Sequence, residues 1–166
     1  MEESVKHLRR LDVLIDDVRR EGRRTDRILT SLPPEFFEYS PSTELRSVQA
    51  LIDHIGAIYL FCARAYRDDV WDHLQAYTDT PAANLVESGR MLTLARDTAS
   101  LSIQSCSAEQ LRAIVFPSFG RPEPAITFLR RALDHEIHHR GELCVYATLF
   151  GSPIEDIYEC ERPVSQ

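Results

Sequence analysis

Apolar residues recur every three or four positions along most of this chain, which is the spacing of amphipathic helices. The first such segment covers about residues 5–32. Gly22 interrupts it, so the segment is either one helix with a weak point or two helices, and Pro33-Pro34 ends it. The link over residues 35–41 carries three aromatic side chains, which we expect to pack as a lid over one end of the core.

The second segment is the most apolar and is therefore predicted to be central. We expect Ser42 or Thr43 to be its N-cap, because a short side-chain oxygen there can accept a backbone N–H, and the helix should run to about Arg67. The third helix is predicted to start at residues 79–81, where a proline occupies the first turn, and to end near Ile103.

A short helical turn and one more long helix follow. Residues 107–110 have the pattern of a capping box, and residues 116–124 contain enough proline and glycine to predict a loop. The last helix should span about residues 125–150 and stop at Gly151, a common C-terminal signal. The remaining tail, about residues 152–166, is predicted to be irregular.

Length and composition fit one globular domain. The chain has 166 residues, 43% of them hydrophobic and 27% charged, which is enough to bury a core. No segment alternates with the period of a strand. Four long amphipathic helices therefore predict an all-α four-helix bundle that covers residues 1–166. No apolar run reaches about eighteen residues, so no membrane partner is expected.

The net charge and the positions of the cysteines limit which binding partners and which cellular compartment we expect. The net charge of −7 argues against nucleic acid, because that interaction needs clustered basic residues. Arginines between Arg9 and Arg27 are interleaved with aspartates, which favours a solvated helix face; a patch for nucleic acid or an acidic partner is the alternative. The four cysteines are far apart and the N-terminus is charged, so we predict a cytoplasmic protein with reduced cysteines.

The chemistry is concentrated in the last helix, where three histidines fall within five residues. His135 and His139 lie one turn apart and point the same way, so they could bind one metal ion together. His138 points roughly 160° from the centre of the apolar face, toward solvent. Catalytic zinc-type sites use three protein ligands. His54, inside the apolar second helix, is a better third ligand than His7 or His73.

Other residues of the last helix are candidates for the surroundings of the metal. Glu136 and Arg140 fall in its apolar sector one turn apart, and such a charge pair could clamp the second helix or serve a subunit contact. Phe128 and Tyr146 share the flank of the histidines and are predicted to line the pocket. Gly141 would let another helix approach closely.

Residues 135–139 also match H-E-x-x-H, the signature of zinc metalloproteases, in which the glutamate is the general base. The downstream ligand of such a protease is hard to find here. The metzincin pattern would need glycine and histidine at the positions of Glu142 and Val145, and Glu159 or Glu161 lies in a short tail. No strand is predicted that could align a peptide substrate, so the protease interpretation is disfavoured.

A different resemblance covers nearly the whole chain. The histidine within the apolar run of residues 47–55, the segment 135–143, Gly151 and the tail over 154–158 together resemble the DinB/YfiT-like family of metalloenzymes. The resemblance implies a four-helix bundle and one divalent metal ion, most often zinc or nickel. The ligands it implies are His54, His135 and His139, the three that the helical wheel also selects.

One position departs from the resembled family, which commonly has glutamine where this chain has Glu142. Glu142 lies on the outer side of the wheel, so little effect on the metal is expected. If it instead contacts a ligand histidine, it should make that imidazole more basic.

Three neutral histidines would leave the ion its charge and an open position, which suits hydrolysis or the activation of a thiol. The resembled family leans toward low-molecular-weight thiols, so a thiol-dependent S-transferase is the favoured prediction. A metal-dependent hydrolase and a non-catalytic metal-binding stress-response protein are the alternatives. A small-molecule substrate is the expected partner, and pairing into a homodimer through helix faces is a further expectation.

Overall fold

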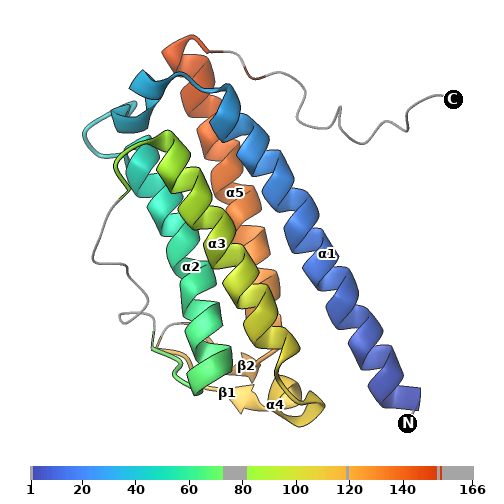
Figure 1. Ribbon diagram of the computed structural model, residues 1–166. Coiled ribbons are helices and arrows are strands. Elements are labelled where there is room, and N and C mark those ends of the chain that lie inside the picture. Colours follow the sequence, from blue (N-terminus) through green and yellow to red (C-terminus); the bar gives the residue numbers. More distant parts are fainter. Residues whose placement is uncertain (1, 73–81, 119, 153, 155–166) are drawn as a thin grey trace, which may run out of the picture.

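Four long helices run side by side in the computed structural model, which describes residues 2–72, 82–118, 120–152 and 154 (Figure 1). They are α1 (Glu2–Ser31), α2 (Val48–Asp68), α3 (Leu85–Gln104) and α5 (Thr127–Phe150). The short helix η1 (Pro34–Glu38) lies at one end of the bundle. At the other end lie α4 (Ala108–Arg112) and the strands β1 (Ile114–Val115) and β2 (Glu123–Pro124). The predicted all-α bundle is confirmed.

The helices form a closed ring in which α2 packs against α3 and α5, and α1 packs against the same two. Apolar faces of all four meet in one core, whose largest fully buried side chains include Tyr59, Phe36 and Phe61. The described helices include none with an apolar stretch long enough to traverse a lipid bilayer. The ring matters for function because it brings α2 against α5.

The start of the second helix was predicted too early. The helix begins at Val48, and its N-cap is Ser47, whose hydroxyl accepts a hydrogen bond from the Ala50 N–H. Residues 42–46 form a turn instead, in which the Ser40 hydroxyl donates to two backbone carbonyls. Serine side chains offer the backbone such local alternatives to a helix, which explains the error.

The third helix also begins later than predicted, at Leu85. The Asn84 side chain accepts the Glu87 N–H at 2.9 Å, and the Glu87 carboxylate accepts the Ala83 N–H at 2.7 Å. This reciprocal pair was visible in the sequence as an N-cap residue followed three positions later by glutamate. The predicted start at residues 79–81 lies outside the described residues.

The first helix, α1, is continuous through Gly22. Of the two predicted alternatives, one helix with a weak point is therefore correct, and two separate helices is wrong. A Cβ at this position would lie 3.0 Å from Cδ of Arg96 on α3. Gly22 therefore marks the place where a long side chain of a neighbouring helix crosses closely, which is a common reason for glycine inside a helix.

Both ends of the bundle are closed by short elements. At one end Phe36 and Tyr39 pack on Phe150, with ring centroids 5.3 and 5.0 Å apart, which confirms the predicted aromatic lid. At the other end β1 and β2 pair antiparallel in a two-residue ladder; β2 lies within the predicted loop, and β1 directly precedes it. Such short strands are below the length at which periodicity can be recognised.

The capping box over residues 107–110 is confirmed, and the last helix stops at Gly151 with a positive φ of 86° as expected. Of the predicted irregular tail, only Ser152 and Ile154 belong to the described residues, and Ile154 packs against the core.

Candidate metal centre

Three histidine side chains from two helices meet between α2 and α5. The Nε2 atom of His135 lies 3.1 Å from Nε2 of His54 and 3.1 Å from Nε2 of His139. One ring nitrogen of each lies within 4.8 Å of one from each of the others. These are the three residues that the sequence selected, brought together across 81 positions of the chain.

The arrangement fits a divalent metal ion better than it fits hydrogen bonding among the rings. Tetrahedral zinc, with Zn–N bonds near 2.0–2.1 Å, separates its nitrogen ligands by about 3.3 Å, close to the distances seen here. Neutral imidazoles carry one donor and one acceptor each, so three clustered nitrogens cannot all be satisfied by one another. A single cation would give every one of them a partner.

The other ring nitrogen of His139 fixes its tautomer. Nδ1 of His139 lies 2.8 Å from a carboxylate oxygen of Glu142, to which it can donate. In a neutral ring this leaves the lone pair on Nε2, facing the other histidines. Glu142 thus contacts a ligand candidate directly, which is the alternative in which it should make that imidazole more basic. Nδ1 of His135 is buried and has no hydrogen-bond partner within the described part of the chain.

Burial and neighbouring charges favour the neutral forms of His135 and His54. Burial, together with the neighbouring His139 and His54, lowers the pKa of His135 to about 4. Burial and the positive charge of Arg46 also lower the pKa of His54. The deprotonated imidazole is the form that binds metal.

The pKa of Glu142 is lowered, whereas burial alone would raise it. Burial raises the pKa of Glu142, but its hydrogen bond and charge interaction with His139, together with the charges of His138 and Arg46, outweigh burial and lower it. The carboxylate therefore stays charged beside the histidines.

His138 behaves as the wheel predicted. Its side chain is 70% exposed, and its Nε2 lies 3.3 Å from Glu142. His138, His139 and Glu142 could form a second metal group, but it shares His139 with the first and lies on the exposed rim. Among the other histidines, the side chain of His7 is not described and His73 lies outside the described residues.

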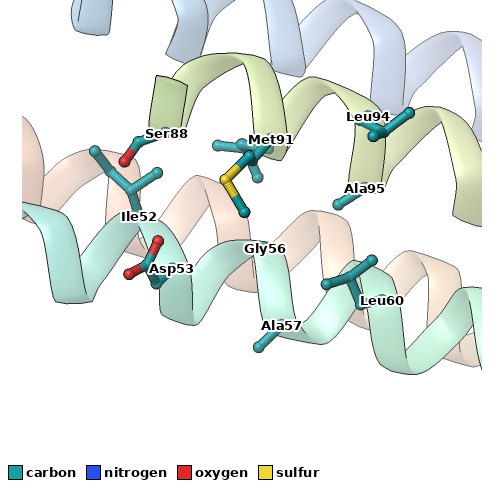
Figure 2. Close-up of a pocket in the computed structure, with 10 residues that line it drawn as sticks. Ile52, Asp53, Gly56, Ala57, Leu60, Ser88, Met91, Leu94 and Ala95 are labelled. Carbon is teal, nitrogen blue, oxygen red and sulfur yellow. The ribbon is translucent and has the colours of Figure 1, made fainter. Parts of the chain in front are cut away.

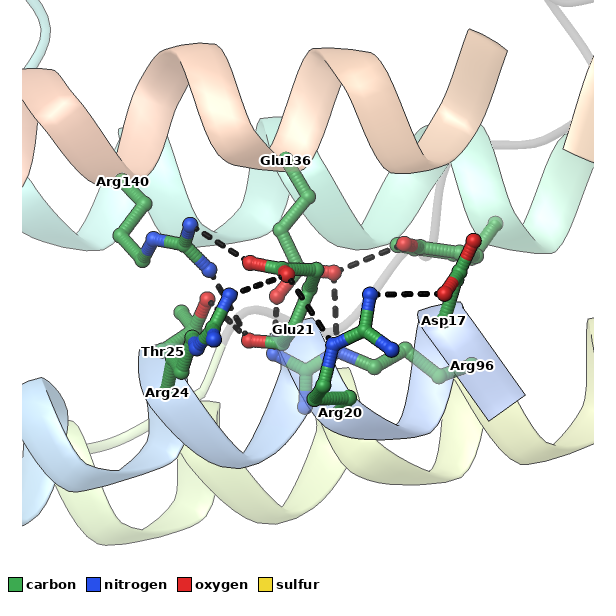
Figure 3. Close-up of polar contacts among 9 residues, drawn as sticks. Asp17, Arg20, Glu21, Arg24, Thr25, Arg96, Glu136 and Arg140 are labelled. Carbon is green, nitrogen blue, oxygen red and sulfur yellow. Dashed lines mark hydrogen bonds and ion pairs between the residues drawn. The ribbon is translucent and has the colours of Figure 1, made fainter. Parts of the chain in front are cut away.

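Glu136 and Arg140 are buried, as predicted, but they do not pair with each other. The Glu136 carboxylate accepts hydrogen bonds from Tyr59 of α2 at 2.7 Å and from Arg96 of α3 at 2.7 and 3.1 Å (Figure 3). Glu136 therefore clamps helix α2, one of the two roles proposed from the sequence, and also α3. Arg96 bonds onward to Asp26 of α1 at 2.8 Å.

Arg140 forms a separate pair with α1. Its guanidinium donates to the carboxylate of Glu21 at 2.8 Å and to the Glu21 carbonyl at 3.0 Å, while Arg24 also pairs with that carboxylate (Figure 3). Burial raises the pKa of Glu21, but the two arginines outweigh it and lower the pKa. The two clusters together tie α5 to all three other long helices.

The two aromatic candidates occupy different places. Phe128 is buried among Phe61 and Trp71, with ring centroids 6.1 and 4.9 Å away. Tyr146 is buried seven residues beyond His139 and packs edge-on against Tyr39 at 6.4 Å. Burial and the charge of Glu142 raise the pKa of Tyr146, so Tyr146 lies within electrostatic reach of the site, whereas Phe128 belongs to an aromatic cluster.

Arg46 was missed by the sequence analysis. It is exposed and lies just before the N-cap of α2, and its positive charge reaches His54, His135, Glu142 and Tyr146. A lone arginine in a turn gave no signal in the sequence. Its relevance follows from the packing of the start of α2 against α5.

Comparisons with known proteins agree with this architecture. The chain is 26% identical over 132 residues to the uncharacterized protein YjoA of Bacillus subtilis (strain 168), covering 76% of this chain and 82% of that protein. The crystal structure of the same DinB-like protein superposes with a TM-score of 0.65 at 21% identity, over 83% of this chain and 91% of the other. The model of the DinB family matches residues 1–165. The chain therefore belongs to the DinB family.

Proposed function

We propose that this protein is a metal-dependent enzyme in which His54, His135 and His139 hold one divalent ion, zinc or nickel, and that it transfers a low-molecular-weight thiol to a small electrophilic substrate. The observation that carries the proposal is the convergence of three Nε2 atoms from α2 and α5. Among the described residues no fourth ligand joins this group, and three protein ligands with a free position are typical of catalytic sites.

A bound divalent ion would supply positive charge that favours a thiolate over its thiol. The thiol would lose its proton to solvent, its sulfur would form a bond to the electrophilic carbon, and the leaving group would depart with the electron pair of the broken bond. Glu142 would hold the His139 ring in its ligating tautomer. The positive charge of Arg46 would favour an anionic co-substrate near the histidines.

We prefer thiol chemistry over hydrolysis because the carboxylate that contacts the histidines is already engaged by them. Hydrolysis profits from a general base poised to accept a proton. Within the described site, the carboxylate that contacts the histidines is Glu142, and it is already engaged by His139 and His138. A thiol has an ordinary pKa near 8.5 and depends less on such a base.

Metal analysis of purified variants tests the ligand set. His54→Ala, His135→Ala and His139→Ala are each expected to abolish stoichiometric binding of zinc and nickel. His138→Ala is the matched control, because it removes an exposed histidine from the same helix turn and should leave the stoichiometry at one. Full metal content in the His54→Ala protein would overturn the three-ligand site.

A screen of the metal-loaded protein tests the reaction. Cysteine, glutathione and other small thiols would be offered with a chromogenic chloronitroarene, and thioether formation followed by absorbance. The proposal expects thiol-dependent product that disappears in His135→Ala. Hydrolysis of ester or amide substrates without thiol dependence would favour the hydrolase instead, and neither activity would favour a non-catalytic metal protein.

A further inference from the structure

A second candidate site lies away from the histidines, in an open groove of about 250 Å³ between α2 and α3 (Figure 2). Adjacent residues on a helix point about 100° apart. His54 faces α5, whereas its neighbour Asp53 lines this groove. The groove is therefore separate from the proposed metal centre. Most of its lining is apolar and comes from Ile52, Gly56, Ala57, Leu60, Met91, Leu92, Leu94 and Ala95.

Two oxygen-bearing side chains in the groove lack partners. The Ser88 side chain is 1% exposed, and its hydroxyl has no hydrogen-bond partner in the described part of the molecule. Asp53 is half-buried, and no hydrogen bond or ion pair joins it to the described residues. Figure 2 shows the two side chains at the same end of the groove, with Met91 reaching over its middle. Buried polar groups are normally paired, so an unpaired, buried hydroxyl on a residue that lines a groove indicates a ligand.

The charge and size of the groove define what would fit. Asp53 is the charged residue of the lining, which contains no basic side chain. The volume exceeds the roughly 150 Å³ of a cavity that admits benzene. A ligand must therefore combine one positive hydrogen-bond donor with a compact apolar body slightly larger than a benzene ring.

We infer that this groove binds a small protonated amine. Its ammonium group donates hydrogen bonds to the Asp53 carboxylate and, once the Ser88 side chain rotates toward the groove, to the Ser88 hydroxyl. Its apolar body lies along the floor formed by Gly56, where the absence of a side chain leaves the space open, and against Leu60. Neutral and anionic molecules of the same shape lack the charge interaction and bind more weakly.

A matched set of three probes tests the inference on the full-length protein by titration calorimetry. Cyclohexylmethylamine should bind, cyclohexylmethanol should bind roughly tenfold more weakly, and cyclohexanecarboxylate should not bind measurably. Asp53→Asn should weaken the amine roughly tenfold and leave the alcohol unchanged. Asp97→Asn, an exposed change on α3 outside the groove, is the control and should change neither.

Two further variants keep the inference falsifiable if Asp53→Asn folds poorly. Ser88→Ala removes a hydroxyl that has no partner, so it should keep the fold by circular dichroism and weaken the amine several-fold. Gly56→Leu should fill the groove and abolish binding of amine and alcohol. Equal affinity of amine and alcohol for the unaltered protein would overturn the inference. The inference would also be overturned if the unaltered protein were a dimer in analytical ultracentrifugation and Gly56→Leu were a monomer. In that case a second copy of the chain would cover the groove.

Discussion

Two pairs of residues on α5 have the same spacing and opposite surroundings. His135 and His139 lie one turn apart and present ring nitrogen atoms to His54 of α2. Glu136 and Arg140 lie one turn apart as well, about 100° further round the helix, and every charge there is matched by Tyr59, Arg96 or Glu21. The charges of the second pair are all matched within the bundle, whereas the first pair supplies two of the three ring nitrogens that could hold a metal ion.

The difference teaches how to separate a binding site from a structural cluster. Both contain groups that are expensive to bury. In the charge network each group has a partner on another helix, so its role is to hold the bundle together. In the histidine cluster three ring nitrogens converge without any charged partner on a third helix, which is why we propose that it binds a cation. The network also holds α5 in the orientation that aims the two histidines at α2.

The largest effect is expected from Glu136→Ala. Removing this carboxylate leaves the Arg96 guanidinium, 4% exposed, beside a hole, and breaking a buried ion pair costs about 3–5 kcal/mol. Urea unfolding of the metal-free protein measures it. His135→Ala in the same metal-free state should cost far less, because its ring is neutral and only half-buried and no charge is left behind; equal losses would erase the distinction between the two pairs.

Gly22→Ala should destabilise the protein although alanine is the better helix former. The new Cβ would meet the Arg96 side chain at 3.0 Å, and crowding of a packed interior costs about 1–3 kcal/mol. Gly141→Ala is the control on α5. A Cβ there meets no atom of the described residues within 4 Å, so the predicted close helix approach at Gly141 is wrong, and the change should stabilise by about 0.5–1 kcal/mol. Thermal unfolding of both variants should shift in opposite directions.

Glu142→Gln should weaken metal binding without removing it. The carboxylate that accepts the His139 N–H would become a neutral amide, and loss of such support commonly reduces metal affinity by roughly tenfold or more. Competition with a chromogenic chelator measures the affinity. Glu87→Gln alters a carboxylate that accepts the Ala83 N–H at the start of α3 and should leave the affinity unchanged. An unaltered affinity in Glu142→Gln would show that the contact does not tune the site.

The smallest effect on the free energy of unfolding is expected from lowering the pH until Glu21 is protonated. The pKa of Glu21 is lower in the folded protein than its ordinary value of 4.5. Its contribution to stability is therefore complete above pH 4.5 and is lost as the pH falls through the folded value. Arg140→Met removes the main partner, so its unfolding free energy should vary less with pH below 4.5 than that of the unaltered protein. Parallel pH profiles of the two would refute this role for the Glu21–Arg140 pair.

Local patterns in the sequence were enough to predict the long helices and part of the histidine cluster. Each long helix shows its apolar stripe in ten to thirty consecutive residues, and the spacing of His135 and His139 follows from the helix alone. His54 could be joined to them because a histidine in a strongly apolar helix needs a partner, and a resemblance supplied the same trio. Caps were less certain, since Ser42 and Ser47 are equally good candidates and turn geometry selects between them.

Tertiary packing decided the rest. The partners of Glu136 lie 40 and 77 positions away and that of Arg140 lies 119 away, and the helical wheel offered only the pair within α5. Gly22 is explained by a side chain from α3, and Arg46 by the approach of α2 to α5. Periodicity reports which face of a helix is buried, but the groups that meet there depend on how the helices are ordered and rotated in the ring, and those are properties of the whole packed core.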